Sequence, residues 1–97
     1  MTPLIQPAQI PYLPRGVRLA DDRVRGIRVL QAPERAMQLD AIGDAILSEL
    51  DGQRSMAVIA TDLAAKYNAP QDQIASDVAD FLTGLIARRM VFVKDMP

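Results

Sequence analysis

The chain has 97 residues, a formal net charge of −1 and 49% hydrophobic residues. This length and composition are sufficient for one compact domain, and the chain is too short for two. It contains neither cysteine nor histidine, which excludes disulfides, zinc sites of the usual Cys/His kind, thiol nucleophiles and imidazole acid–base catalysis. No apolar run approaches the roughly 20 residues of a membrane span, and the N-terminus lacks the layout of a secretion signal, so we expect a cytoplasmic protein.

Proline recurs through residues 1–14, at Pro3, Pro7, Pro11 and Pro14. Proline lacks a main-chain donor and pushes the residue before it towards extended conformations. We therefore expect a flexible Pro-rich arm over 1–14 and a single folded domain over 15–97.

From residue 17 onward, apolar and polar residues alternate with the period of two that places apolar side chains on one face of a strand. The apolar members of this pattern are Val17, Leu19, Ile27 and Val29. Residues 20–23, Ala-Asp-Asp-Arg, have the composition of a turn. The pattern predicts a hairpin with strands at 17–20 and 25–31, and a third short strand at 35–39.

The apolar spacing becomes helical after the third strand. Asp40 is the expected N-cap of a first helix over 41–50, which ends before an Asp-Gly pair. Ser55 is the expected N-cap of a second helix, and Asn68 ends it.

A third and longer helix begins after Pro70 and carries a broad apolar stripe of nearly five turns. Residues 90–93, Met-Val-Phe-Val, then return to the composition of a strand. The order of elements predicts an α+β fold that is winged-helix-like, with an N-terminal three-stranded antiparallel sheet packed on a three-helix bundle.

Charge decides whether this pattern indicates a DNA-binding protein. Six of the eleven basic residues precede Asp40 but only three of the twelve acidic ones do, which leaves nine acidic against five basic residues in the helical half. A helix that enters the major groove lies beside phosphates, and an acidic helical half repels them. A winged-helix DNA-binding transcription regulator therefore remains only as the alternative function.

No arrangement of residues indicates catalysis. Asp21 and Asp22 are adjacent, but neighbouring strand or turn residues point apart, and no third carboxylate lies near them in sequence. The sequence shows no glycine-rich phosphate loop, nucleophile–base pair or metal-ligand spacing. We therefore expect a binding module rather than an enzyme, without a cofactor, a metal site, a nucleic-acid partner or a membrane partner.

Several short motifs, in their order and spacing, resemble the pyrroloquinoline quinone (PQQ) biosynthesis protein D family, PqqD, from Pro14 to Val93. The motifs are RGVRL at 15–19, VL at 29–30 followed by PE at 33–34, IL at 46–47 before DG at 51–52, and Asp77-Val78. The departures from the usual family pattern are Gln31 for an apolar residue, Asp40 for Asn, Ile42 for Thr and Leu50 for Cys.

The resemblance implies a small peptide chaperone of the precursor-recognition type. Such domains bind the ribosomally made precursor peptide of the quinone cofactor and present it to a radical S-adenosylmethionine (SAM) enzyme, which crosslinks a glutamate to a tyrosine. The iron–sulfur chemistry belongs to that enzyme, which agrees with a chaperone that has no cysteine.

Family members bind the peptide as an added strand beside the third strand and against the third helix. Mapped onto this chain, the third strand contributes Arg35, Ala36, Met37, Gln38 and Leu39, and the third helix contributes Ile74, Asp77, Val78, Phe81, Leu82 and Leu85. The apolar helix residues have a second interpretation as ordinary core, which we expect to hold for most of them. Asp77 and Arg35 are candidates for fixing the peptide register at the rim.

The arginines that precede Asp40 allow two interpretations. They form a solvated face that pairs with the acidic helices, or a steering surface for an acidic partner. Under the second interpretation, Arg15, Arg18 and Arg28 contact the partner enzyme.

An open strand edge can also pair with a second copy of the chain. We therefore expect a monomer in dilute solution and a strand-exchanged dimer at high concentration.

Overall fold

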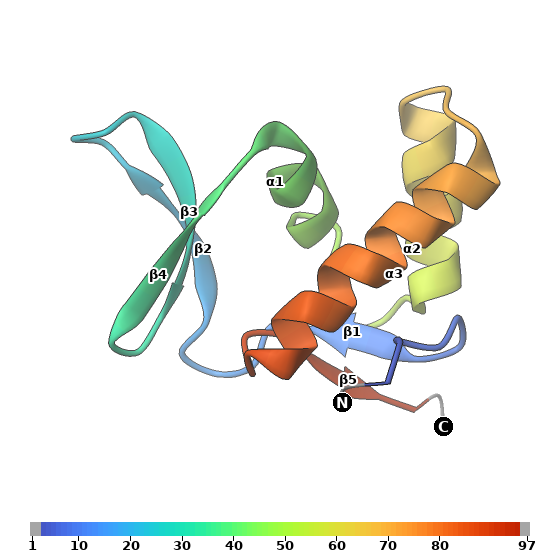
Figure 1. The fold of residues 1–97 in the computed structure, drawn as a ribbon, viewed down its shortest axis with the longest axis horizontal. Coiled ribbons are helices and arrows are strands. Elements are labelled where there is room, and N and C mark those ends of the chain that lie inside the picture. Colours follow the sequence, from blue (N-terminus) through green and yellow to red (C-terminus); the bar gives the residue numbers. More distant parts are fainter. Residues whose placement is uncertain (1–2, 96–97) are drawn as a thin grey trace.

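The computed structural model describes residues 3–95, which form a mixed α/β fold of three helices and two small sheets (Figure 1). The elements are β1 (Ile10–Tyr12), β2 (Arg18–Asp22), β3 (Ile27–Ala32), β4 (Arg35–Leu39), α1 (Ala41–Leu47), α2 (Met56–Lys66), α3 (Gln71–Ala87) and β5 (Phe92–Lys94). The three-stranded sheet lies at one end of the molecule and α2 and α3 at the other, with α1 between them (Figure 1).

The expected three-stranded antiparallel sheet is present, in the order β2-β3-β4. Its first turn lies later than predicted, because Asp21 and Asp22 belong to β2 rather than to the turn. The Asp22 carboxylate accepts hydrogen bonds from the main-chain N–H groups of Val24 and Arg25, both at 3.1 Å. Gly26 closes the turn with φ of 68°, a conformation that glycine adopts without strain.

The face of β3 that packs on the core is not the one that the alternating pattern identified as apolar. Leu30 and Ala32 are buried in the core, whereas Ile27 and Val29 lie on the opposite face and are half-buried. The alternation alone does not identify the buried face, because both faces of β3 carry apolar residues and only packing against the helices distinguishes them.

The predicted flexible arm is the main correction to the fold, within residues 3–14; Met1 and Thr2 lie outside the described residues. Ile5 is 2% exposed and its N–H donates to the Thr83 hydroxyl at 3.0 Å. The carbonyls of Pro7 and Gln9 accept from the N–H groups of Ala57 and Met56 at 3.0 and 2.8 Å. These donors belong to the first turn of α2, where no intrahelical partner exists, so the N-terminal segment caps that helix.

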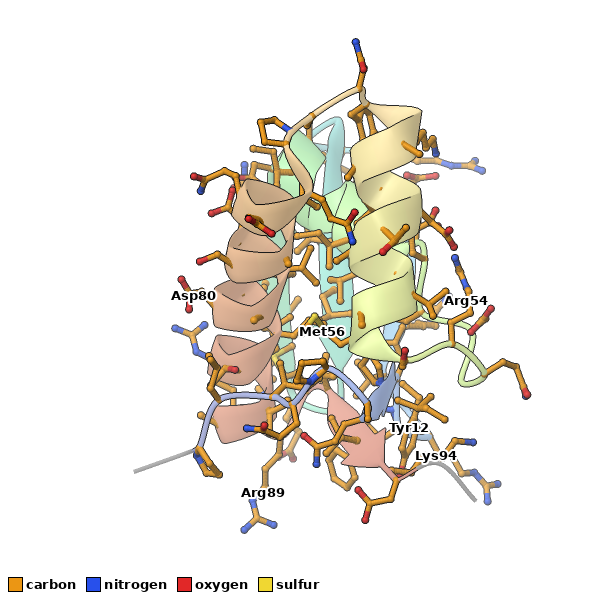
Figure 2. All side chains as sticks on the ribbon, turned by 90° about the vertical axis from the view of Figure 1, so that its right-hand side faces the viewer. Tyr12, Arg54, Met56, Asp80, Arg89 and Lys94 are labelled. Carbon is orange, nitrogen blue, oxygen red and sulfur yellow. The ribbon has the colours of Figure 1, made fainter. Side chains whose placement is uncertain are left out.

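The same segment contributes β1, which was not predicted because prolines are unfavourable in most strand positions. β1 pairs antiparallel with β5, with Pro11 opposite Val93, and each of these strands has one partner among the described residues. An edge strand accommodates proline when its nitrogen faces away from the partner strand. The second sheet therefore joins the two ends of the chain below α2 and α3 (Figures 1 and 2).

The helices begin where predicted. The Asp40 carboxylate accepts from the N–H of Gly43 at 2.7 Å, and the Ser55 hydroxyl accepts from the N–H of Val58 at 3.3 Å, so both N-caps are confirmed. α1 ends at Leu47 rather than at residue 50, because Glu49 and Leu50 close tighter turns that donate three residues back.

The core lies between the helices and the inner face of the three-stranded sheet. Met56 points into the space between α2 and α3 and is 4% exposed (Figure 2). The other main members of the core are Leu30, Leu47, Ile59, Leu63, Val78, Leu82, Leu85 and Val91. Burial of these side chains fixes α3 against β4, and this arrangement creates the candidate site.

Candidate functional site

The outer edge of β4 has no strand partner among residues 3–95, because β4 pairs with β3 on its other side only. In an antiparallel pair every second residue turns its main-chain N–H and C=O groups away from the partner strand. The edge from Arg35 to Leu39 therefore offers unpaired main-chain groups to an incoming chain.

A groove of about 410 Å³ lies between this edge and α3. It is lined by Met37, Gln38 and Leu39 of β4, by the helix cap Asp40 and by Phe81 of α3. Leu39 is buried, while Met37 and Phe81 are half-buried and present apolar surface to the groove. The site thus combines main-chain hydrogen-bonding groups with an apolar wall.

Two arginines lie beside the groove next to Met37. The Arg35 guanidinium donates to the main-chain carbonyl of Arg88, at the end of α3. The Arg88 guanidinium in turn lies 3.5 Å from the Met37 sulfur. These contacts join the start of β4 to the end of α3 and set the separation between the two walls.

Gly43 positions Phe81 in the wall of the groove. A Cβ atom at Gly43 would lie 3.1 Å from Cζ of Phe81 and 3.2 Å from the Asp40 carboxylate. Because glycine has no side chain, the Phe81 ring packs directly over the first turn of α1. The position of the ring beside β4 therefore depends on Gly43.

A second pocket, of about 310 Å³, lies between α1, the end of α2 and the start of α3. Its wall includes Ile42, Tyr67, Ile74 and Asp77. Ile42 and Tyr67 are large side chains that are 67% and 56% exposed. Ile74, Asp77 and Phe81 follow one another at helical spacing, so one face of α3 runs from this pocket to the groove beside β4.

The structure brings together most of the residues predicted for peptide binding. Met37, Gln38, Leu39 and Phe81 line the groove, Ile74 and Asp77 line the second pocket, and Arg35 and Ala36 lie exposed on β4. Leu82 and Leu85 are corrected to core, because they are 0% and 3% exposed and support the wall from beneath. Val78 is 1% exposed and forms the floor of the second pocket.

Sequence reasoning missed Asp40, Ile42, Tyr67 and Arg88 as neighbours of this surface. Ile42 and Tyr67 belong to apolar helical stripes, which usually indicate core. Both residues lie at the ends of their stripes, where a short helix leaves its terminal apolar residues exposed. This position in the stripe could have identified them as surface residues.

The three arginines predicted to bind an enzyme have different surroundings. Arg15 and Arg18 are exposed. The Arg28 guanidinium bonds to Asp21 and to Asp44, both at 3.1 Å, and these hydrogen bonds raise its pKa above the ordinary value. Arg28 therefore links β3 to α1 and belongs to the interior side of the sheet.

Comparison with known proteins identifies the family of this chain. The model of the family described as coenzyme PQQ synthesis protein D (PqqD) matches residues 28–91. The chain belongs to the PqqD family. A relative from Rhizobium meliloti (strain 1021), named PqqA binding protein, is 49% identical over 89 residues, which cover 92% of this chain and 91% of the relative.

Two solved PqqD structures share the fold. The solution NMR structure of the PqqD truncation of Methylobacterium extorquens PqqCD, described as a functional and stand-alone RiPP recognition element, matches with a TM-score of 0.78 at 39% identity and covers 91% of this chain and 94% of that one. The crystal structure of PqqD from Xanthomonas campestris matches with a TM-score of 0.57 at 42% identity, over 80% of this chain and 87% of that one.

The described part of the chain carries no group of three or more Asp, Glu, His or Cys residues that could hold a metal ion. Within residues 3–95, none of the helices combines the length and apolar character needed to cross a membrane. The relative from Rhizobium meliloti is named for binding, and the solution structure from Methylobacterium extorquens is described as a recognition element.

Proposed function

We propose that this PqqD chain binds PqqA, the ribosomally made precursor peptide of PQQ, and presents it to the radical SAM enzyme of the same pathway. The observation that carries the proposal is the unpaired edge of β4 above an apolar groove, in a chain 49% identical to a PqqA binding protein. The chain acts by binding, and the chemistry on the peptide belongs to the enzyme.

The peptide binds as an added strand beside β4. Main-chain hydrogen bonds to the open edge provide affinity, and alternate peptide side chains enter the groove formed by Met37 and Phe81. Burying one leucine- or phenylalanine-sized side chain contributes about 1.5–3 kcal/mol. Beyond the end of β4, the peptide follows α3 into the second pocket beside Ile42 and Ile74.

Charged residues at the rim set the register of the bound peptide. Asp40 and Asp77 lie exposed next to the groove and the second pocket, and Arg35 lies at the other end of β4. A peptide with a cationic residue near the second pocket and an anionic residue near Arg35 matches this arrangement.

The alternative function, a winged-helix DNA-binding regulator, has weaker support. α3 exposes Asp72, Asp77 and Asp80 to solvent, so its surface is acidic. We therefore propose that a winged-helix arrangement of this chain binds a peptide rather than DNA. Asp80 points outward from α3, away from α2 (Figure 2). A phosphate backbone would be repelled by this helix.

Titration of isotope-labelled protein with PqqA peptide tests the proposal. We expect binding at micromolar concentration or below, with amide shifts concentrated in β4 and along the Phe81 face of α3. Binding without shifts in the β4 amides would contradict the strand-addition mode, and absence of binding would contradict the proposed function.

The chain contains two phenylalanines, and they form a matched pair of variants. Phe81→Ala removes the groove wall, and we expect the dissociation constant for PqqA to rise about tenfold, equivalent to ~1.4 kcal/mol. Phe92→Ala removes a side chain that is 41% exposed on β5, and we expect no change in PqqA affinity. Calorimetry on both variants, after a thermal melt to confirm folding, measures the difference.

A further inference from the structure

The three-stranded sheet has an outer face that nothing in the described chain covers. Because strand residues alternate, the register places one set of side chains on this outer face: Arg18, Ala20, Asp22, Ile27, Val29, Gln31, Ala36 and Gln38. The opposite set includes Leu30 and Leu39, which are buried in the core. All three helices lie on one side of the sheet (Figure 1).

The outer face is hollow at its centre. Small and branched apolar residues, Ala20 opposite Val29, occupy the middle of the sheet, and longer side chains stand around them. The resulting depression has a volume of about 810 Å³. A half-buried apolar centre with polar surroundings is the usual anatomy of a protein–protein contact.

The outer face carries positively charged side chains that are exposed and unpaired within residues 3–95. Arg18 and Arg23 line the depression, are exposed, and form no ion pair within residues 3–95. Arg25 lies 3.7 Å from Asp22 and Arg28 is held by Asp21 and Asp44, so these two arginines are already paired. The uncompensated cations therefore favour a partner whose surface carries carboxylates.

The depression reaches the edge at which the peptide is proposed to bind. Ala36 and Gln38 line the depression and also belong to β4, the edge strand beside the groove. A peptide added beside β4 continues the sheet by one strand. Half of its side chains then face the groove at α3, and the other half join the outer face.

We propose that the outer face of the sheet, together with the outward side chains of the bound peptide, forms one composite surface that docks the modifying enzyme. The inference rests on the proposed function, because the peptide strand supplies part of the surface. The partner is a protein surface rich in carboxylates, which Arg18 and Arg23 attract. Peptide and enzyme then bind cooperatively, since each completes the contact area of the other.

Charge reversal tests the arginines. We expect Arg18→Glu/Arg23→Glu to weaken binding of the radical SAM enzyme at least tenfold, mainly through slower association at low salt, with PqqA affinity changed less than twofold. Arg89→Glu/Lys94→Glu makes the same change in charge at the β5 end of the molecule and is expected to leave enzyme binding unchanged (Figure 2). Equal losses in the two double variants overturn the assignment of the face.

A scan of the peptide tests the composite surface. PqqA variants with single glutamate substitutions are measured for affinity to this chain and, at saturating peptide, for affinity of the complex to the enzyme. We expect the two losses to alternate along the strand-paired segment: inward positions weaken binding to this chain, and outward positions weaken binding of the enzyme.

The outcomes separate this inference from the proposed function. If PqqA binds and the enzyme has the same affinity with and without peptide, the composite surface is wrong and the proposed function stands. If PqqA does not bind, both are wrong. If Arg18→Glu/Arg23→Glu abolishes binding to duplex DNA but not to the enzyme, the outer face is a nucleic-acid site and the inference is overturned.

Discussion

At the scale of single residues, small changes in side-chain size and charge determine the shape of the groove and the stability of its support. Gly43 gives Phe81 room to pack over α1, and the Asp40 carboxylate caps the same helix. The Arg54 guanidinium forms ion pairs with Glu49, Asp51 and Asp62, which fasten the loop between α1 and α2 to α2 itself.

Gly43→Ala tests how Phe81 is positioned. Alanine favours the helix by up to ~1 kcal/mol over glycine, but its Cβ would lie 3.1 Å from the Phe81 ring and push it towards the groove. We expect PqqA affinity to fall about fivefold while the melting temperature changes little. In a Phe81→Leu background the ring is absent, so the same substitution should have no further effect on affinity; an unchanged loss there would contradict the steric explanation.

Asp51 makes folding stability depend on acid pH. Its carboxylate accepts hydrogen bonds from the main-chain N–H groups of Arg54 and Gln53, which lower its pKa from 3.8 to about 2. Because the folded pKa lies below the unfolded one, the stabilisation is complete above about pH 4 and is lost as pH falls towards 2. Urea unfolding from pH 6 to pH 2 should show a gap between wild type and Asp51→Asn that narrows over this window; a constant gap would contradict the linkage.

At the scale of elements, the N-terminal segment is part of the fold. Its carbonyls cap α2, its Ile5 side chain lies in the core, and β1 pairs with β5. These contacts hold the C-terminal end of α3, and Arg88 at that end accepts the hydrogen bond from Arg35 beside the groove. The segment therefore supports the site from a distance.

Two adjacent residues measure this contribution. Ile5→Ala deletes a side chain that is 2% exposed, and we expect the free energy of unfolding to fall by about 2–3 kcal/mol. Leu4→Ala changes a side chain that is 51% exposed and should cost less than about 0.5 kcal/mol. Urea denaturation distinguishes the two, and equal small losses would indicate that residues 3–14 are a flexible arm after all.

At the scale of the whole molecule, the three-stranded sheet is a separate layer that contacts the helices through its inner face. Among residues 3–95 its two edge strands, β2 and β4, have no outer strand partner, and the outer face that carries Arg18 is uncovered. The two solved PqqD structures have similar identity to this chain, 39% and 42%, yet their TM-scores are 0.78 and 0.57. The two structures therefore resemble this chain to different degrees at similar sequence identity.

The open edge leads to a prediction about self-association. We expect a monomer in dilute solution and a strand-exchanged dimer at high concentration, because a second copy can occupy the same edge at little thermodynamic cost. Added PqqA should shift the equilibrium towards monomer, since peptide and second copy compete for β4. Sedimentation over a wide concentration range checks this: a monomer at every concentration contradicts exchange, and a dimer that binds PqqA unchanged contradicts the shared edge.

Local sequence patterns were sufficient for most of the elements. The caps Asp40 and Ser55, the three helices and the strand at 35–39 follow from interactions between residues close in sequence, which side-chain type and spacing largely determine. The open third strand and the Phe81 stripe were likewise identified as the candidate site, through the resemblance to PqqD and the spacing of α3.

Only tertiary structure decided which face of β3 is buried, which stripe residues line the groove, and whether the proline-rich start of the chain is ordered. Ile27 and Leu30 are similarly hydrophobic, and only the packing of the core shows that Leu30 is the buried one. Pro11 belongs to a strand because β5, some 80 residues later, supplies a partner for β1, and an edge strand tolerates proline. These outcomes depend on contacts between residues far apart in sequence, which local periodicity does not contain.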